Sequence, residues 1–129
     1  MKQKFSSAWT ASAKPRKQRK WRANAPLHVK QKLMGCLLSK ELRKKWGRRH
    51  ATVRVGDTVK IMRGQYKKKS GKVERIIRLR NKIIISGIEV AKRDGSKTSY
   101  PIHPSNVMIT DLITTDKERL PSRVIKEKK

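Results

Sequence analysis

An excess of positive charge limits what this chain can fold into more than any other feature of its sequence. Its 129 residues include 36 lysines and arginines against 9 aspartates and glutamates, a formal net charge of +27 at pH 7. A compact state must hold these charges close together, and their repulsion opposes folding. Hydrophobic residues make up 35% of the chain, which is enough for one modest core. The sequence therefore predicts one small folded domain with long basic segments, and a polyanion such as nucleic acid as its partner.

The sequence lacks the patterns of a membrane protein, a metalloprotein or an enzyme with a recognisable active-site motif. Its longest aliphatic run, Ile83 to Ile85, is far shorter than the roughly 18 residues of a membrane-spanning helix. One cysteine, Cys36, and three widely spaced histidines form no metal-ligand cluster. Glycine-rich phosphate loops, nucleophile elbows and paired-carboxylate motifs are absent from the sequence. We therefore expect no catalytic residues, no metal, no cofactor, no membrane contact and no small-molecule substrate.

The first 50 residues form the most basic part of the chain and hold a single acid, Glu41. Within them, residues 14–22, here called the basic arm, place six cations around Trp21. Residues 1–24 contain too few apolar side chains to offset the entropy of ordering them, so we expect them to be disordered in the free protein. Cations beside an aromatic ring suit phosphate contact together with base stacking. We interpret residues 1–50 as an RNA-binding extension rather than a nuclear localisation signal or a flexible tail.

Two short helices are expected in the second half of this extension. Asn24, followed by Pro26 near a first turn, has the pattern of a helix start, and Ser39 is typical of a second cap. Apolar residues then recur at helical spacing until a glycine ends each run. The sequence predicts helices over about 26–34 and 39–46.

From Val53 onward the apolar period changes from helical to two, which is typical of strands. Segments rich in valine and isoleucine alternate with turn residues, and Asp94-Gly95 is a strong hairpin signal. Five or six short strands in about 60 residues predict a small antiparallel, SH3-like barrel over residues 51–115. We expect residues 116–129 to form a charged tail, disordered in the free protein. The period-two pattern assigns these residues to the core: Val59, Ile61, Val73, Ile77 and Ile85.

The most informative string covers residues 55–73. Gly56-Asp57 turns the chain into a strand, and Gly64 and Gly71 bound a loop that carries Tyr66 and three consecutive lysines. Lysines beside an aromatic ring suit contact with phosphate and stacking on a base or sugar. This strand–loop–strand unit resembles the KOW motif, which occurs in several RNA-associated proteins. The resemblance implies a mainly β fold with a small SH3-like barrel and an RNA ligand.

The flanking segments make the resemblance more specific. Residues 100–109 are similar to the closing strand of the KOW-type family of large-subunit ribosomal proteins, which is numbered twenty-four in bacteria and archaea and twenty-six in many eukaryotes. Residues 24–28 and 38–43 resemble the N-terminal extension of its archaeal and eukaryotic members. The resemblance covers about residues 14–112. It departs from the family pattern at Lys67-Lys68, where the family usually has Lys-Gly.

This resemblance implies a structural protein of the cytoplasmic ribosome that is a monomer within the large subunit. It implies direct binding to the large-subunit rRNA near its 5′ end, an early role in assembly, a position close to the exit of the polypeptide tunnel, and contacts with neighbouring ribosomal proteins. The alternative is a KOW-domain transcription elongation or antitermination factor that docks on RNA polymerase. A docking module of that kind would normally be one domain of a longer chain, and it would not need so basic an extension.

The residues expected to bind RNA fall into three groups. The basic arm contributes Lys14, Arg16, Lys17, Arg19, Lys20, Trp21 and Arg22. The junction between extension and barrel contributes Arg48, Arg49 and His50. The loop and the proline-bounded turn near the end of the barrel contribute Arg63, Tyr66, Lys67, Lys68, Lys69, Lys72, His103, Ser105 and Asn106. Structural roles are expected instead for Cys36, a buried filler, for Asp57, which shapes its turn, and for Trp46, which packs on the domain.

Overall fold

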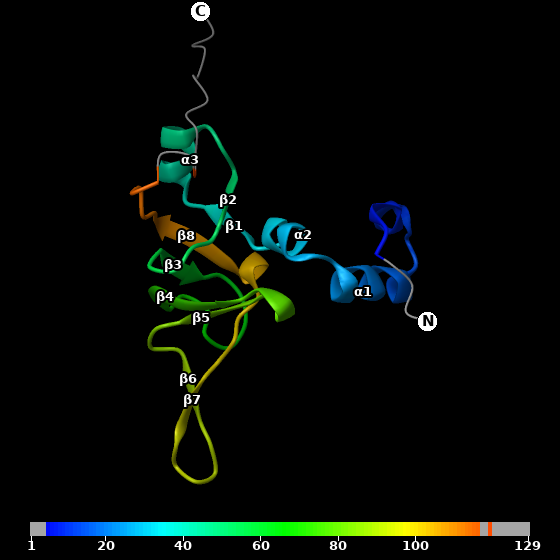
Figure 1. Cartoon of the computed structure of the whole chain (residues 1–129). Helices are drawn as coiled ribbons and strands as arrows, with labels where there is room; N and C mark the ends of the chain where they lie inside the picture. Colours follow the sequence, from blue (N-terminus) through cyan, green and yellow to red (C-terminus); the bar gives the residue numbers. More distant parts are fainter. Residues whose placement is uncertain (1–4, 117–118, 120–129) are drawn as a thin grey trace, which may run out of the picture.

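The computed structural model describes residues 5–116 and residue 119, and it shows a mainly β fold preceded by short helices (Figure 1). Within these residues the strands are β1 (Gly35–Leu38), β2 (His50–Thr52), β3 (Thr58–Ile61), β4 (Ser70–Ile77), β5 (Lys82–Ile85), β6 (Glu89–Ala91), β7 (Lys97–Ser99) and β8 (Val107–Asp111). The helices are α1 (Pro15–Asn24), α2 (Leu27–Lys32) and α3 (Lys40–Trp46), with 3-10 turns η1 (Ser7–Ala11), η2 (Arg78–Arg80) and η3 (Pro104–Asn106). The predicted fold class is confirmed.

The main sheet closes on itself next to β8. Its strands lie in the order β2-β1-β8-β3-β4-β5. At the free side of β5, Ile83 and Ile102 exchange two backbone hydrogen bonds of 2.8 and 2.9 Å. The chain runs from Ile102 through η3 into β8, and β8 pairs antiparallel with β3. Strands β3, β4, β5 and β8 with this connecting stretch therefore form a small barrel.

Two strands that the sequence does not predict extend this sheet. The pattern of residues 35–38 predicts only a junction between helices, but they form β1, which pairs antiparallel with β2 and parallel with β8. Cys36 and Leu38 are fully buried in the core. A strand of four residues is too short for its period to be distinguished from the end of a helix. The sequence predicts a division of the chain at residue 50 into an RNA-binding extension and a barrel. This division stays a prediction, because it concerns RNA binding.

The two predicted helices are present, with changes in length. Helix α3 begins after Ser39, whose Oγ accepts a hydrogen bond from the Leu42 amide at 3.3 Å. It ends at Gly47, which has a φ of 60° in the left-handed region that glycine adopts readily. Helix α2 is shorter than the predicted 26–34, because strand pairing begins at Gly35.

A single hydrophobic cluster of the described residues fills the barrel and reaches β1 and β2. Four of the predicted core residues are at most 1% exposed: Val59, Ile61, Val73 and Ile85. Burial, and then the nearby charge of Asp57, raise the pKa of the Cys36 thiol to about 12. The thiol therefore stays protonated and acts as the predicted apolar filler. Trp46 packs against the cluster from outside, as expected.

A β-bulge explains why the remaining core prediction, Ile77, is wrong. The register between β4 and β5 shifts between Val73 and Arg75, so two residues separate Val73 from the next inward position. Ile76 takes that position opposite the buried Ile83 and packs on the core. Ile77 is only half-buried. A strict period of two assigns the wrong face to every residue beyond such a bulge.

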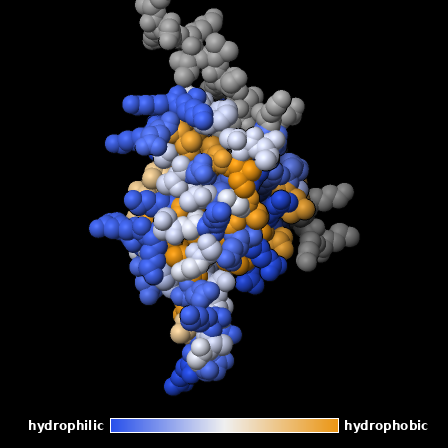
Figure 2. Space-filling model, turned by 90° about the vertical axis from the view of Figure 1, so that its left-hand side faces the viewer, coloured by the Kyte–Doolittle hydropathy of each residue, from blue (hydrophilic) through white to orange (hydrophobic). Residues whose placement is uncertain are grey.

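Strands β6 and β7 form a hairpin that projects from the barrel (Figure 1). Its tip is the predicted Asp94-Gly95 turn, in which Gly95 has a φ of 81° and the Asp94 carboxylate accepts a hydrogen bond from the Ser96 amide at 2.9 Å. Every residue of both strands is exposed. On the face drawn in Figure 2, hydrophilic side chains cover most of the hairpin, whereas apolar side chains gather over the body of the domain.

Candidate nucleic-acid interface

The basic arm lies mostly on α1, although the sequence predicts a disordered segment. Pro15 occupies the first turn, and most of the remaining residues are lysine, arginine and glutamine, whose straight side chains favour helices. The expectation of disorder is therefore wrong for residues 15–24, while residues 1–4 lie outside the described chain. The six cations of the basic arm are all exposed. Their contact with RNA stays a prediction.

Neighbouring residues hold α1 in place. Lys30 is 5% exposed and donates a hydrogen bond from Nζ to the carbonyl oxygen of Ala23 at 3.1 Å. This ammonium group satisfies a carbonyl near the C-terminal end of the helix, where a positive charge is favoured. The rings of Phe5 and Trp21 lie 6.1 Å apart. Trp21 is half-buried, which leaves only part of its ring for the predicted stacking on RNA.

The structure brings the three junction residues together. Arg48, Arg49 and His50 line a hollow of about 360 Å³ with Gly47, directly after α3. Arg49 and His50 are exposed, and Arg48 is half-buried. His50 begins β2, so its pairing with β1 fixes the direction of this segment. The junction therefore offers a positively charged hollow of its own.

The loop between β3 and β4 keeps its predicted lysines Lys67, Lys68 and Lys69 exposed, and the predicted Lys72, near the start of β4, is exposed beside it. Lys68 has a φ of 75°, a left-handed conformation that favours glycine. This is the position at which the KOW pattern usually has glycine, so the loop keeps a glycine-like backbone there despite the substitution. The Lys68 amide donates a hydrogen bond to the Ile61 carbonyl at 2.9 Å. At Gly71 a Cβ atom would lie 2.6 Å from the Ser86 carbonyl oxygen, so the returning strand needs glycine.

The loop and the proline-bounded turn meet at one small pocket. Its volume is about 90 Å³, far below the roughly 300–1,000 Å³ of pockets that take whole ligands. It is lined by four of the predicted residues, Arg63, Tyr66, His103 and Asn106, and by two that the sequence does not single out, Lys82 and Tyr100. Two cations beside neutral donors suit an oxyanion such as phosphate. Ser105 is exposed on the same turn.

Tyr66 is partly committed to contacts within the protein. Its hydroxyl donates a hydrogen bond to the Glu89 carbonyl at 3.0 Å, and its ring packs against the core. The Tyr100 ring lies 5.2 Å away at an angle of 50°, and the Lys69 ammonium lies 5.4 Å from the centre of the Tyr66 ring. The exposed Tyr100 ring therefore offers more surface for stacking than the half-buried Tyr66 ring.

His103 is held as a neutral imidazole. Its Nδ1 accepts a hydrogen bond from the Ser105 amide at 3.2 Å, which requires an unprotonated nitrogen. Burial, and then the positive charges of Lys82 and Arg22, lower the pKa of His103 below its ordinary value. The other ring nitrogen, Nε2, therefore carries the proton and is a donor.

We expect stability to fall when the pH drops from about 7.5 to about 5.5, because the unfolded chain binds a proton at His103 more readily than the folded chain. The stabilisation is fully present above the unfolded pKa of His103 and is lost as the pH falls from there through the lower folded pKa. His103→Asn retains a capping oxygen but does not titrate, so it should lose less stability over this range. Urea unfolding at both pH values measures the difference. An equal loss in the two proteins would contradict the prediction.

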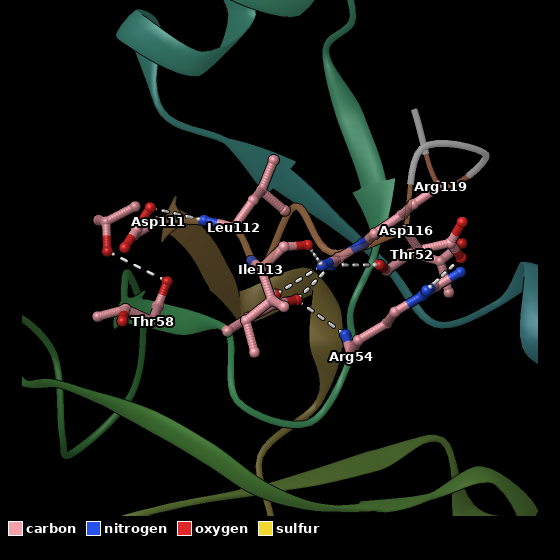
Figure 3. Close-up of polar contacts among 10 residues, drawn as sticks. Thr52, Arg54, Thr58, Asp111, Leu112, Ile113, Asp116 and Arg119 are labelled. Carbon is pink, nitrogen blue, oxygen red and sulfur yellow. Dashed lines mark hydrogen bonds and ion pairs between the residues drawn. The ribbon is translucent and has the colours of Figure 1, made fainter. Parts of the chain in front are cut away.

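A buried ion pair that the sequence does not predict joins Asp57, at the end of the β2–β3 connection, to Arg119, whose contacts are drawn in Figure 3. The Asp57 carboxylate accepts a hydrogen bond from the Arg54 amide at 2.8 Å, which confirms its role in the turn. It also binds the guanidinium of Arg119, whose side chain is 4% exposed. Arg119 donates further to the carbonyl oxygens of Thr52 and Ile113, at 3.0 and 3.1 Å. The rest of the predicted tail beyond Asp116 lies outside the described residues.

The chemistry of these surfaces is that of anion binding. The basic arm, the junction and the loop present cations, and the pocket adds neutral donors. In the part of the chain that the structure describes, no group of three or more histidine, cysteine, aspartate or glutamate residues could hold a metal ion. Among the described helices, none has the length and apolar character needed to cross a membrane.

Known proteins resemble this chain over most of its length. Residues 12–128 match the model of a family described as the eukaryotic L26 and archaeal L24 ribosomal proteins. A large ribosomal subunit protein uL24 from Methanosarcina barkeri is 51% identical over 111 residues, which cover 86% of this chain and 96% of the relative. The uL24 of Methanocella arvoryzae is 50% identical over 111 residues, 86% of this chain and 89% of the relative. The chain therefore belongs to this family of eukaryotic L26 and archaeal L24 ribosomal proteins, which are structural proteins and not enzymes.

Proposed function

We propose that this protein is a structural constituent of the large ribosomal subunit and binds the large-subunit rRNA directly. The observation that carries the proposal is the display of exposed cations on two separate elements, α1 and the loop between β3 and β4. If the lysines and arginines only kept the surface solvated, they would not need to outnumber the aspartates and glutamates fourfold. Membership of a ribosomal family supports rRNA as the polyanion that neutralises them.

The finer placement rests on the resemblance of residues 14–112 to the archaeal and eukaryotic members of the family. We propose binding near the 5′ end of the large rRNA, an early role in assembly, and a position close to the tunnel exit of cytoplasmic ribosomes, with other ribosomal proteins as neighbours. The alternative is a transcription factor that docks on RNA polymerase. The family match from residue 12 to residue 128 includes the basic extension as well as the barrel, and it favours the ribosomal role.

Co-sedimentation tests this proposal. A tagged copy expressed in an archaeal host should sediment with large ribosomal subunits and should be released when the salt concentration is raised. The same gradient probed for RNA polymerase provides the alternative outcome. Co-migration with polymerase and absence from the large-subunit fractions would overturn the ribosomal assignment.

Neutralising the basic arm should weaken rRNA binding and its salt dependence. We expect the triple change Lys17→Gln, Arg19→Gln and Lys20→Gln to make the log–log salt slope shallower by about two to three, because each phosphate contact in a duplex contributes about 0.9. The matched control, Lys17→Arg, Arg19→Lys and Lys20→Arg, keeps every charge and should keep the slope. Filter binding to a transcript of the 5′ region of an archaeal large-subunit rRNA measures both. Identical slopes for the two triple variants would show that the basic arm does not contact the RNA.

A further inference from the structure

A groove on another part of the molecule lies apart from the residues predicted to bind RNA. Its volume is about 830 Å³, within the roughly 300–1,000 Å³ of typical ligand pockets. It is walled by the end of α2, the connection from β2 to β3, the second half of β4 with η2, and Arg119. None of the residues predicted to bind RNA lines it. It is therefore a separate candidate site.

The groove exposes apolar side chains that a domain with so small a core would be expected to bury. Leu79 is 72% exposed and Val55 is 55% exposed, and both line the groove. Ile76 and Ile77 are half-buried beside them. Contiguous apolar surface of this kind, rimmed by charged residues, marks binding sites on soluble proteins.

The charge of the lining selects an anionic occupant. Four arginines line the groove with a single acid, Glu74. Two of them already have partners, since Arg54 pairs with Asp116 at 2.6 Å and Arg119 pairs with Asp57. The side chains of the other two, Arg75 and Arg78, form no hydrogen bond or ion pair with any described residue. Two exposed guanidinium groups beside an apolar surface are therefore available to a ligand.

We propose that this groove binds one unstacked nucleotide of the rRNA, with its base against the apolar side chains and a phosphate on Arg75 and Arg78. The proposal rests on the proposed function, because the large-subunit rRNA is the anion that would surround the protein. Every base has an apolar face, and proteins recognise RNA mainly through bases that are splayed out of the helix. Guanidinium groups bind phosphate through two parallel hydrogen bonds and also stack on bases.

Measurements of RNA affinity and of its salt dependence distinguish the apolar contact with the base from the arginine contact with the phosphate. Leu79→Ser removes an apolar contact and no charge, so it should lower affinity for the rRNA transcript about threefold at every salt concentration, with an unchanged slope. Arg75→Gln with Arg78→Gln should lower affinity about tenfold or more and make the slope shallower by about two. Leu37→Ser is the matched control, because Leu37 is 44% exposed and lies outside the groove. Its affinity should equal that of the unmodified protein. Equal affinity of Leu79→Ser and Leu37→Ser would overturn the proposal.

Photo-crosslinking in assembled subunits identifies the occupant directly. The photoreactive residue p-benzoylphenylalanine is placed at position 79, or at position 37 as the control, and large subunits are purified and irradiated. We expect an RNase-sensitive product at position 79 that maps to one unpaired rRNA nucleotide. A crosslinked product that resists RNase and contains a second protein would overturn the proposal that a nucleotide occupies the groove, and so would the absence of any product. Either result would leave the ribosomal assignment intact. Absence of the unmodified protein from large subunits would overturn the ribosomal assignment and the groove ligand together.

Discussion

Replacing Asp57 with alanine should destabilise the free protein by about 3–5 kcal/mol, because it leaves the buried guanidinium of Arg119 without its counter-charge. The change also removes the acceptor for the Arg54 and Ile113 amides, at 2.8 and 3.2 Å. A domain of this size has only about 3–5 kcal/mol to lose, so much of the population should unfold at room temperature. Thermal melts and urea unfolding followed by circular dichroism measure the loss.

Two further variants separate the charge from the turn. Asp57→Asn retains an oxygen that can accept one of the amide hydrogen bonds but removes the charge, so its stability should lie between those of the unmodified protein and Asp57→Ala. Arg119→Met leaves both amide contacts of Asp57 in place but leaves its buried carboxylate without a counter-charge, so it should also destabilise the protein by about 3–5 kcal/mol. If Asp57→Ala melts at the temperature of the unmodified protein, the ion pair does not hold this part of the chain.

The sequence predicts the barrel well because its signals are local. A period of two, the glycine-bounded loop and the Asp94-Gly95 turn each act within about ten residues, where single-sequence patterns are informative. Strand β1 escapes prediction because its membership in the sheet depends on pairing with β8, about 70 residues away. The bulge after Val73 also escapes prediction, because it changes which face of the sheet the later side chains occupy without changing the composition of the strand.

The candidate site likewise has one part that the sequence predicts and another that it does not. Charge and aromatic content point to single residues such as Arg63 and His103, and the structure places these two on one pocket. Lys82 and Tyr100 complete that pocket, but only the bridge between Ile83 and Ile102 brings their segments together. The groove and the ion pair of Asp57 with Arg119 join segments even further apart along the chain. Contacts of this kind depend on the closed fold, and composition or spacing cannot reveal them.

Core packing and RNA contact should separate cleanly within the barrel. Ile61 is 1% exposed and lies on β3, between β4 and β8. Ile61→Ala removes buried methyl groups and leaves a cavity, so it should cost about 2–4 kcal/mol and partly unfold the free protein. The rRNA transcript should restore folding, because a ligand present at about 100 times its Kd stabilises the folded state by about 2.7 kcal/mol.

The exposed loop lysines should behave in the opposite way. Lys67→Ala with Lys68→Ala should leave stability unchanged or slightly higher, since removing two positive charges relieves self-repulsion in a chain of net charge +27. The same double variant should bind the rRNA transcript more weakly, with a salt slope shallower by about two. Thermal melts of both variants with and without the transcript test the two expectations together. If the double lysine variant melts at a lower temperature yet binds RNA normally, the loop stabilises the barrel and does not contact the RNA.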